Sequence, residues 1–114
     1  MKLVVAIVRP FKVPEITDAM SHEPGFPGVT VVSCRGFGRE RARPHTHNAH
    51  EDLSDFTDYE MLLVAAPSES ASNVVDRLAQ LAHTGHPGDG KVFVLDLTAA
   101  LGISTGVSGE GALR

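Results

Sequence analysis

The stretch Thr84–Val94, TGHPGDGKVFV, decides how this chain is organised. Its glycines and its proline predict a tight turn, and the apolar run that follows predicts a strand. Glycine allows positive φ and close approach to a ligand, and consecutive N–H groups in such a turn can bind an anion. Lys91 adds a positive charge at the exit of the turn. On these residues alone a plain helix–strand turn is the simpler interpretation, and an anion site is the alternative.

Apolar periodicity on both sides of this turn predicts the other elements. Val74, Leu78, Leu81 and their neighbours recur at helical spacing after Ser68, which predicts a helix that ends at the turn. An earlier helix carries a proline in its first turn, at position 14, and ends before residues 24–25. The predicted strands cover residues 3–8, 29–34, 59–66 and 92–97. Residues 41–58 are polar and aperiodic, which is typical of a long functional or mobile loop.

This order predicts an α+β, ferredoxin-like βαββαβ domain, with a four-stranded antiparallel sheet and both helices on one face. Residues 1–114 are expected to form a single domain, with a flexible tail at about residues 102–114. The first strand is apolar at every position, so the helix-free face of the sheet must also be covered. Self-association would cover it.

The composition restricts the class of protein. With 10 Lys and Arg against 14 Asp and Glu, the formal net charge of -4 argues against nucleic-acid binding. No apolar run reaches membrane-spanning length and the N-terminus lacks a signal-peptide pattern, so no direct membrane insertion is expected. The single cysteine, Cys34, cannot form an internal disulfide, which favours a cytoplasmic protein and a small buried side chain.

Four segments carry a resemblance to a known family. Residues 84–93 match the signature T-x-x-x-G-D-G-K-[IV]-F, and residues 5–12, 28–31 and 36–39 match further motifs, including G-x-T-V and G-F-G-R. The chain therefore resembles the P-II nitrogen-regulatory signal-transduction family over essentially its whole length, with one extra residue near positions 24–26. The resemblance implies a homotrimer that binds adenine nucleotide between subunits. It also implies a T-loop, about residues 39–58, that docks onto a membrane transporter or a metabolic enzyme.

The resemblance also implies a set of nucleotide-binding residues. One subunit would contribute Ile7, Thr30, Gly36, Phe37, Gly38 and Arg39. The turn would complete the site with Gly88, Asp89, Gly90 and Lys91, and Lys91 would contact the phosphates. A guanidinium group and glycine N–H groups suit phosphate oxygens. Family members are not enzymes, and the residues show no convincing catalytic constellation, so an enzyme is the weakest alternative.

Several positions depart from the family pattern. The loop reads HNAHED where the family commonly has Y-R-G-A-E-Y, so uridylylation at that site is excluded. Glu40 and Tyr59 stand where the family has a glutamine and a lysine that serve 2-oxoglutarate, so no ordinary 2-oxoglutarate response is expected. Gly102 and Ser104 replace two arginines that hold the outer phosphates. We therefore expect ADP or AMP binding, or weak ATP binding.

Three loop histidines, His45, His47 and His50, suggest an alternative function. Neutral imidazole is a common metal ligand, and the H-x-H-x-x-H spacing would let the rings converge on one divalent ion such as zinc, copper or nickel. A metal-responsive protein on the same fold is therefore the alternative to a nucleotide-binding regulator. The same histidines also suit a pH-sensitive docking surface or simple solvent exposure, and the sequence leaves these interpretations open.

Overall fold

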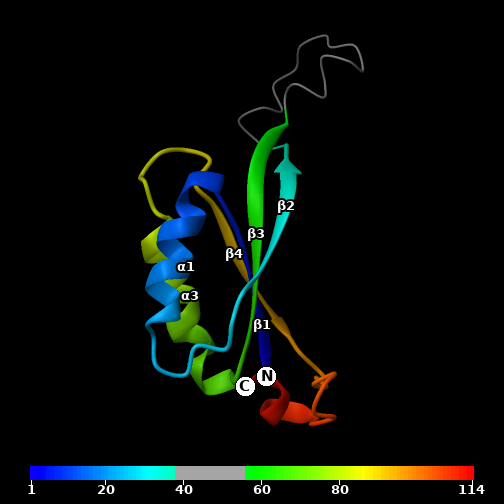
Figure 1. Cartoon of the computed structure of the whole chain (residues 1–114). Coiled ribbons are helices and arrows are strands. Elements are labelled where there is room, and N and C mark those ends of the chain that lie inside the picture. The colour runs from blue at the N-terminus through cyan, green and yellow to red at the C-terminus, as the bar shows by residue number, and fades with distance from the viewer. Residues whose placement is uncertain (38–55) are drawn as a thin grey trace.

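The structure is a computed structural model that describes residues 1–37 and 56–114 (Figure 1). The strands and α-helices follow in the predicted order. The elements are β1 (Lys2–Val8), η1 (Pro10–Lys12), α1 (Val13–Ser21), β2 (Thr30–Gly36), β3 (Thr57–Ala66), α3 (Ser68–Ala82), β4 (Gly90–Asp96) and η3 (Gly109–Leu113), where η marks a short 3-10 helix.

The four strands form one antiparallel sheet in the order β2-β3-β1-β4. β1 is central, so Val5 is paired with Leu63 of β3 on one side and with Phe93 of β4 on the other. Figure 1 shows α1 and α3 together on one face of this sheet. The predicted ferredoxin-like fold is confirmed, because both β-α-β crossovers place their helix on the same side.

The core lies between the sheet and the two helices. Val4, Ala6 and Val8 alternate along β1 and are at most 1% exposed. The residues that pack with them are Leu62 and Val64 of β3, Ile16 and Met20 of α1, and Leu78 and Ala82 of α3. Because successive side chains of a strand point to opposite faces, Val4, Ala6 and Val8 all point toward the helices. The packing of these side chains against α1 and α3 holds the two helices on the sheet. No helix in the described ranges is long and apolar enough to cross a membrane.

Among residues 1–37 and 56–114, the helix-free face of the sheet carries apolar side chains that stay partly exposed in the single chain. On β1 it carries Leu3, Val5 and Ile7, which are half-buried. Their neighbours on the edge strand β4, Phe93 and Leu95, are each 49% exposed. A contiguous exposed apolar face of this kind marks an interaction surface. It agrees with the expectation, drawn from the first strand, that this face needs a cover.

Several strand boundaries differ from the sequence prediction, chiefly the end of β2, which runs to Gly36 rather than to residue 34, and the starts of β3 and β4. β4 begins at Gly90 rather than at residue 92, because Gly90 and Lys91 pair with Val8 and Ile7 of β1. The end of the glycine-rich stretch is therefore part of the sheet. β3 begins at Thr57, so the last two residues assigned to the loop, 57–58, also belong to the sheet.

The C-terminal tail carries local structure. Leu101 and Ser108 form an isolated antiparallel bridge, and the N–H of Gly102 donates to the carbonyl of Val107 over 2.8 Å. The short helix η3 follows this turn. The flexibility expected for the tail stays a prediction.

Candidate functional site

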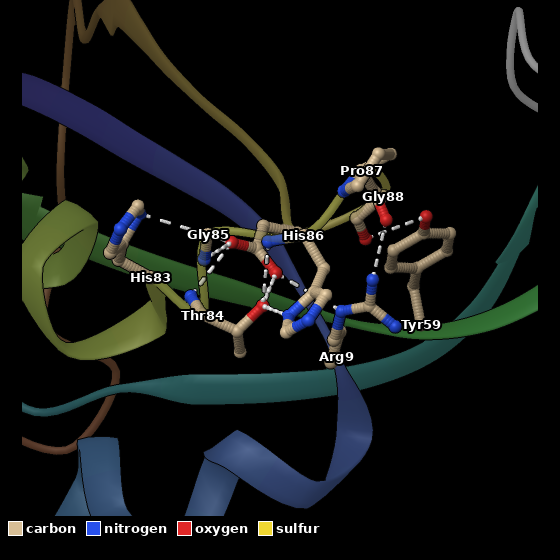
Figure 2. Close-up of polar contacts among 9 residues, drawn as sticks. Arg9, Tyr59, His83, Thr84, Gly85, His86, Pro87 and Gly88 are labelled. Atoms are coloured by element: carbon tan, nitrogen blue, oxygen red, sulfur yellow. Dashed lines mark hydrogen bonds and ion pairs between the residues drawn. The ribbon is translucent and has the colours of Figure 1, made fainter.

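Asp89 organises the glycine turn, residues 84–90, which joins α3 to β4 (Figure 2). Its carboxylate accepts hydrogen bonds from the N–H of Thr84 over 2.7 Å, from the N–H of Gly85 over 3.0 Å and from the Thr84 hydroxyl. The Nε of Arg9 donates to the same carboxylate over 3.1 Å. Hydrogen bonds from Thr84, the hydroxyl first, hold the pKa of Asp89 well below its ordinary value. The carboxylate therefore stays ionised and ties the start of the turn to its end.

Two side chains from outside the turn fix its backbone. Arg9, which directly follows β1, donates through Nη2 to the Pro87 carbonyl over 2.6 Å. Tyr59 of β3 donates its hydroxyl to the Gly88 carbonyl over 3.0 Å, as Figure 2 shows. The turn is thus tied to β1 and β3, the two inner strands of the sheet.

Gly90 is the point where the turn approaches β1 most closely. Its φ is 112°, and a Cβ built on it would lie 1.7 Å from the carbonyl oxygen of Ile7. Such a distance leaves no room for any side chain, so only glycine fits here. This geometric requirement explains the second glycine of the G-D-G motif without reference to a ligand.

Lys91 gives the site its positive charge. It is exposed on β4, and no carboxylate in residues 1–37 or 56–114 forms an ion pair with it. Together with Ile7, Asp89 and His83 it lines a surface pocket of about 290 Å³. The lysine can therefore bind a phosphate or carboxylate group. Ligand pockets usually span about 300–1,000 Å³, so a nucleotide would need a further wall.

Two histidines belong to the frame of the turn. The N–H of His86 donates to the hydroxyl oxygen of Thr84 over 3.2 Å. His83, directly after α3, has its Nδ1 3.9 Å from a carboxylate oxygen of Asp89. The ring nitrogen Nδ1 of His86 lies 3.3 Å from the same Thr84 oxygen, so both rings lie beside the Asp89 hydrogen-bond network.

The structure brings some of the predicted site residues together and leaves others apart. Ile7 meets the predicted turn residues, 88–91, at the end of β1. Gly36 contacts the turn only indirectly. A Cβ on this glycine would lie 3.2 Å from two carbons of the Tyr59 ring, and the hydroxyl of Tyr59 donates to the turn at Gly88. Thr30 is different: it begins β2, and β2 and β4 are opposite edges of the sheet. One chain therefore does not bring Thr30 to Lys91.

Phe37 packs at the base of the long loop. Its ring centroid lies 5.4 Å from that of Phe56, which precedes β3. The other predicted residues of this region lie outside the described residues, namely Gly38 and Arg39 of the nucleotide site and His45, His47 and His50 of the metal site. Within the described parts of the chain, no group of three or more His, Cys, Asp or Glu side chains is placed to hold a metal ion.

The anchoring roles of three residues are not predicted by the sequence patterns, although Thr84 is the first residue of the matched signature. Arg9 and Thr84 anchor Asp89, and Tyr59 anchors Gly88. A single acidic residue in a glycine-rich turn indicates that hydrogen-bond donors elsewhere in the chain bind its carboxylate. The sequence does not name the donor, because Arg9 and Asp89 are separated by 80 positions. The structure also gives Asp89 a role in shaping the turn, in addition to any contact with a ligand.

Acid is expected to loosen the turn through Asp89. Because its pKa is lowered in the folded chain, the carboxylate contributes stability above its ordinary pKa of about 3.9, and the contribution is lost as the pH falls further. Thermal unfolding measured from neutral to strongly acidic pH should therefore show a smaller acid-induced decrease in Asp89→Asn than in the unmodified chain. Asp96→Asn is the matched control, because the pKa of Asp96 is also lowered, by Lys2, but far from the turn. Identical pH profiles for the two variants would contradict the role given to Asp89.

The comparisons with known proteins cover nearly the whole chain. Residues 1–107 match the family model described as nitrogen regulatory protein P-II. The chain is 34% identical over 113 residues to the nitrogen regulatory protein P-II of Azospirillum brasilense, covering 99% of this chain and 100% of that protein. For nitrogen regulatory protein P-II 1 of Escherichia coli (strain K12) the identity is 33% with the same coverage.

A comparison with solved structures also finds a PII protein. The crystal structure of Arabidopsis thaliana PII bound to citrate matches with a TM-score of 0.79 and 30% sequence identity, covering 97% of this chain and 90% of that one. Sequence and fold therefore agree over the sheet, both helices and the glycine turn. This chain belongs to the P-II family of nitrogen regulatory signal-transduction proteins.

Proposed function

We propose that this P-II protein is a cytoplasmic homotrimer that binds an adenine nucleotide in the clefts between its subunits. The observation that carries the proposal is the glycine turn. Its backbone is held in place by Arg9, Tyr59 and Asp89, and the exposed Lys91 follows it directly. A fixed loop of amide groups beside a lysine is suited to bind phosphate oxygens.

The cleft between subunits is proposed because one chain supplies only part of a site. The pocket at Lys91 is small for a nucleotide, and Thr30 lies on the opposite edge of the sheet. A second copy packed on the apolar helix-free face would cover that face and would add the missing wall. The exposure of Phe93 and Leu95 on the same edge as Lys91 supports this arrangement.

The ligand is proposed to be ADP or AMP, or ATP bound weakly. Gly102 and Ser104 carry no charge where the family often has arginines for the outer phosphates. An ordinary 2-oxoglutarate response is not expected, because the hydroxyl of Tyr59 is engaged with Gly88 and offers no positive charge to a second dianion. The citrate in the Arabidopsis PII structure supports small-anion binding within this fold.

The output is proposed to be control of a membrane transporter or a metabolic enzyme through the T-loop, about residues 39–58. The protein itself is proposed to catalyse no reaction. Uridylylation of the loop has no acceptor, because Tyr59 is the only tyrosine in the chain and lies within β3. The metal-responsive alternative depends on His45, His47 and His50, which lie outside the described residues, and it stays a prediction.

Replacing Lys91 by alanine tests the nucleotide site. We expect the affinity for ADP, measured by isothermal titration calorimetry, to fall about 10- to 100-fold, because a charge-assisted hydrogen bond contributes about 1.5–3 kcal/mol. Lys2→Ala is the control, since Lys2 pairs with Asp96 at the other end of β1. The proposal is wrong if the unmodified chain binds no adenine nucleotide, or if Lys91→Ala binds ADP as tightly as Lys2→Ala.

A further inference from the structure

We propose that Tyr59 is a positioning residue of the nucleotide site, and that its hydroxyl aims a backbone N–H of the glycine turn at the phosphates. The inference rests on the proposed function, because it assigns a new role within that same site. It starts from the hydrogen bond that the Tyr59 hydroxyl donates to the Gly88 carbonyl over 3.0 Å. Figure 2 shows the ring reaching the turn from β3, next to Arg9.

Peptide geometry converts this contact into the orientation of a donor. A peptide bond is planar, and every one in the described chain is trans, so a carbonyl and the N–H of the next residue point in opposite directions. When Tyr59 holds the Gly88 carbonyl, the N–H of Asp89 is directed away from the tyrosine. In the same way Arg9 holds the Pro87 carbonyl and directs the N–H of Gly88.

The two amides fixed in this way are available to a ligand. Among residues 1–37 and 56–114 the N–H of Gly88 has no hydrogen-bond acceptor, and the N–H of Asp89, which closes the turn at residues 87–88 toward the carbonyl of His86, makes no hydrogen bond of normal length and angle. Gly88 has a φ of 89°, and a left-handed residue brings successive amides into the concave arrangement that binds anions. Tyr59 therefore fixes the direction of the Asp89 N–H, and Arg9 fixes the direction of the Gly88 N–H. These two consecutive donors lie beside the exposed Lys91.

The tyrosine ring is itself held in place, which is what a positioning residue requires. A Cβ on Gly36 would lie 3.2 Å from the Cδ2 and Cε2 atoms of Tyr59, so the ring lies directly against the backbone of β2. Cys34, two residues earlier, is the cross-strand partner of Tyr59. Because β2 fixes the ring from one side, the hydroxyl has little freedom to leave the Gly88 carbonyl.

Tyr59→Phe tests the inference in the full-length protein, because it removes the hydroxyl and keeps the ring against Gly36. In two-dimensional ¹H–¹⁵N NMR spectra we expect the amide signal of Asp89 to shift. By calorimetry we expect ADP affinity to fall about three- to tenfold, as for loss of one hydrogen bond, and adenosine affinity to stay unchanged because adenosine has no phosphate. Ser33→Ala is the matched control, since it removes another β2–β3 hydroxyl, one that donates to Glu60 and not to the turn.

The outcomes separate this inference from the nucleotide proposal. Equal losses for ADP and adenosine, or an unchanged Asp89 signal with unchanged ADP affinity, would overturn the role of Tyr59. If the unmodified protein binds no ADP, a titration with inorganic pyrophosphate decides. Pyrophosphate that moves the Asp89 amide signal in the unmodified protein but not in Tyr59→Phe would support the role of Tyr59 and reject the nucleotide. Pyrophosphate that moves the signal in neither protein, or equally in both, would reject the role of Tyr59.

Discussion

Gly90→Ala is expected to destabilise the folded protein by about 3–6 kcal/mol, through overpacking and backbone strain together. A Cβ at this position would lie 1.7 Å from the carbonyl oxygen and 2.8 Å from the carbonyl carbon of Ile7, both of which belong to the backbone. The clash cannot be relieved by rotating a side chain. Because Gly90 pairs with Val8 in the ladder between β1 and β4, relief requires the edge strand to move. Such a loss is a large part of the 5–15 kcal/mol that stabilises a typical domain.

The matched control for Gly90→Ala is Gly28→Ala. Gly28 also has positive φ, 97°, but a Cβ built on it has nothing within 4 Å. The control therefore measures the cost of the left-handed backbone alone, about 1–2 kcal/mol. Urea unfolding of both variants gives the two values. Similar values for the two variants would show that β4 moves away from β1 at little cost, which would contradict the close approach described for Gly90.

The fold could be predicted from the sequence because each element carries its own local signal. β1 is marked by an apolar run between residue 2 and the proline at position 10, and α3 by apolar residues such as Leu78 and Ala82 at helical spacing. The order of the elements then leaves few topologies open. The start of β4 at Gly90 escapes prediction because glycine is a weak strand former, and only the pairing with Val8 places it in the sheet.

The candidate site could be predicted only in part. The glycine turn with Lys91 is a continuous stretch, so its residues are visible together in the sequence. The groups that hold it are not, because Arg9 meets Asp89 across 80 positions and Tyr59 meets Gly88 across 29. Thr30 shows a further limit. Thr30 can share a site with Lys91 only if the two residues come from different copies of the chain. A single sequence does not indicate how two copies pack against each other.

A charge placed at the centre of the helix-free face is expected to abolish self-association. Val5 lies on the central strand between Leu63 and Phe93, so glutamate at this position would be buried in any assembly that covers this face. An uncompensated buried charge costs about 3–5 kcal/mol, and every subunit of the assembly would carry one. We therefore expect Val5→Glu to behave as a monomer in analytical ultracentrifugation. Since the proposed site needs a wall from a second copy, the same variant should also lose measurable ADP binding.

The control for Val5→Glu is Ser72→Glu, which adds the same charge at an exposed position of α3. This variant should keep the assembly and the ADP affinity of the unmodified protein. Circular dichroism of Val5→Glu separates dissociation from unfolding, because the core on the other side of β1, around Val4 and Ala6, is unchanged. A folded Val5→Glu monomer that binds ADP with full affinity would show that one chain holds the nucleotide alone. A Val5→Glu protein that keeps the mass of the unmodified assembly would show instead that the subunits meet through another surface.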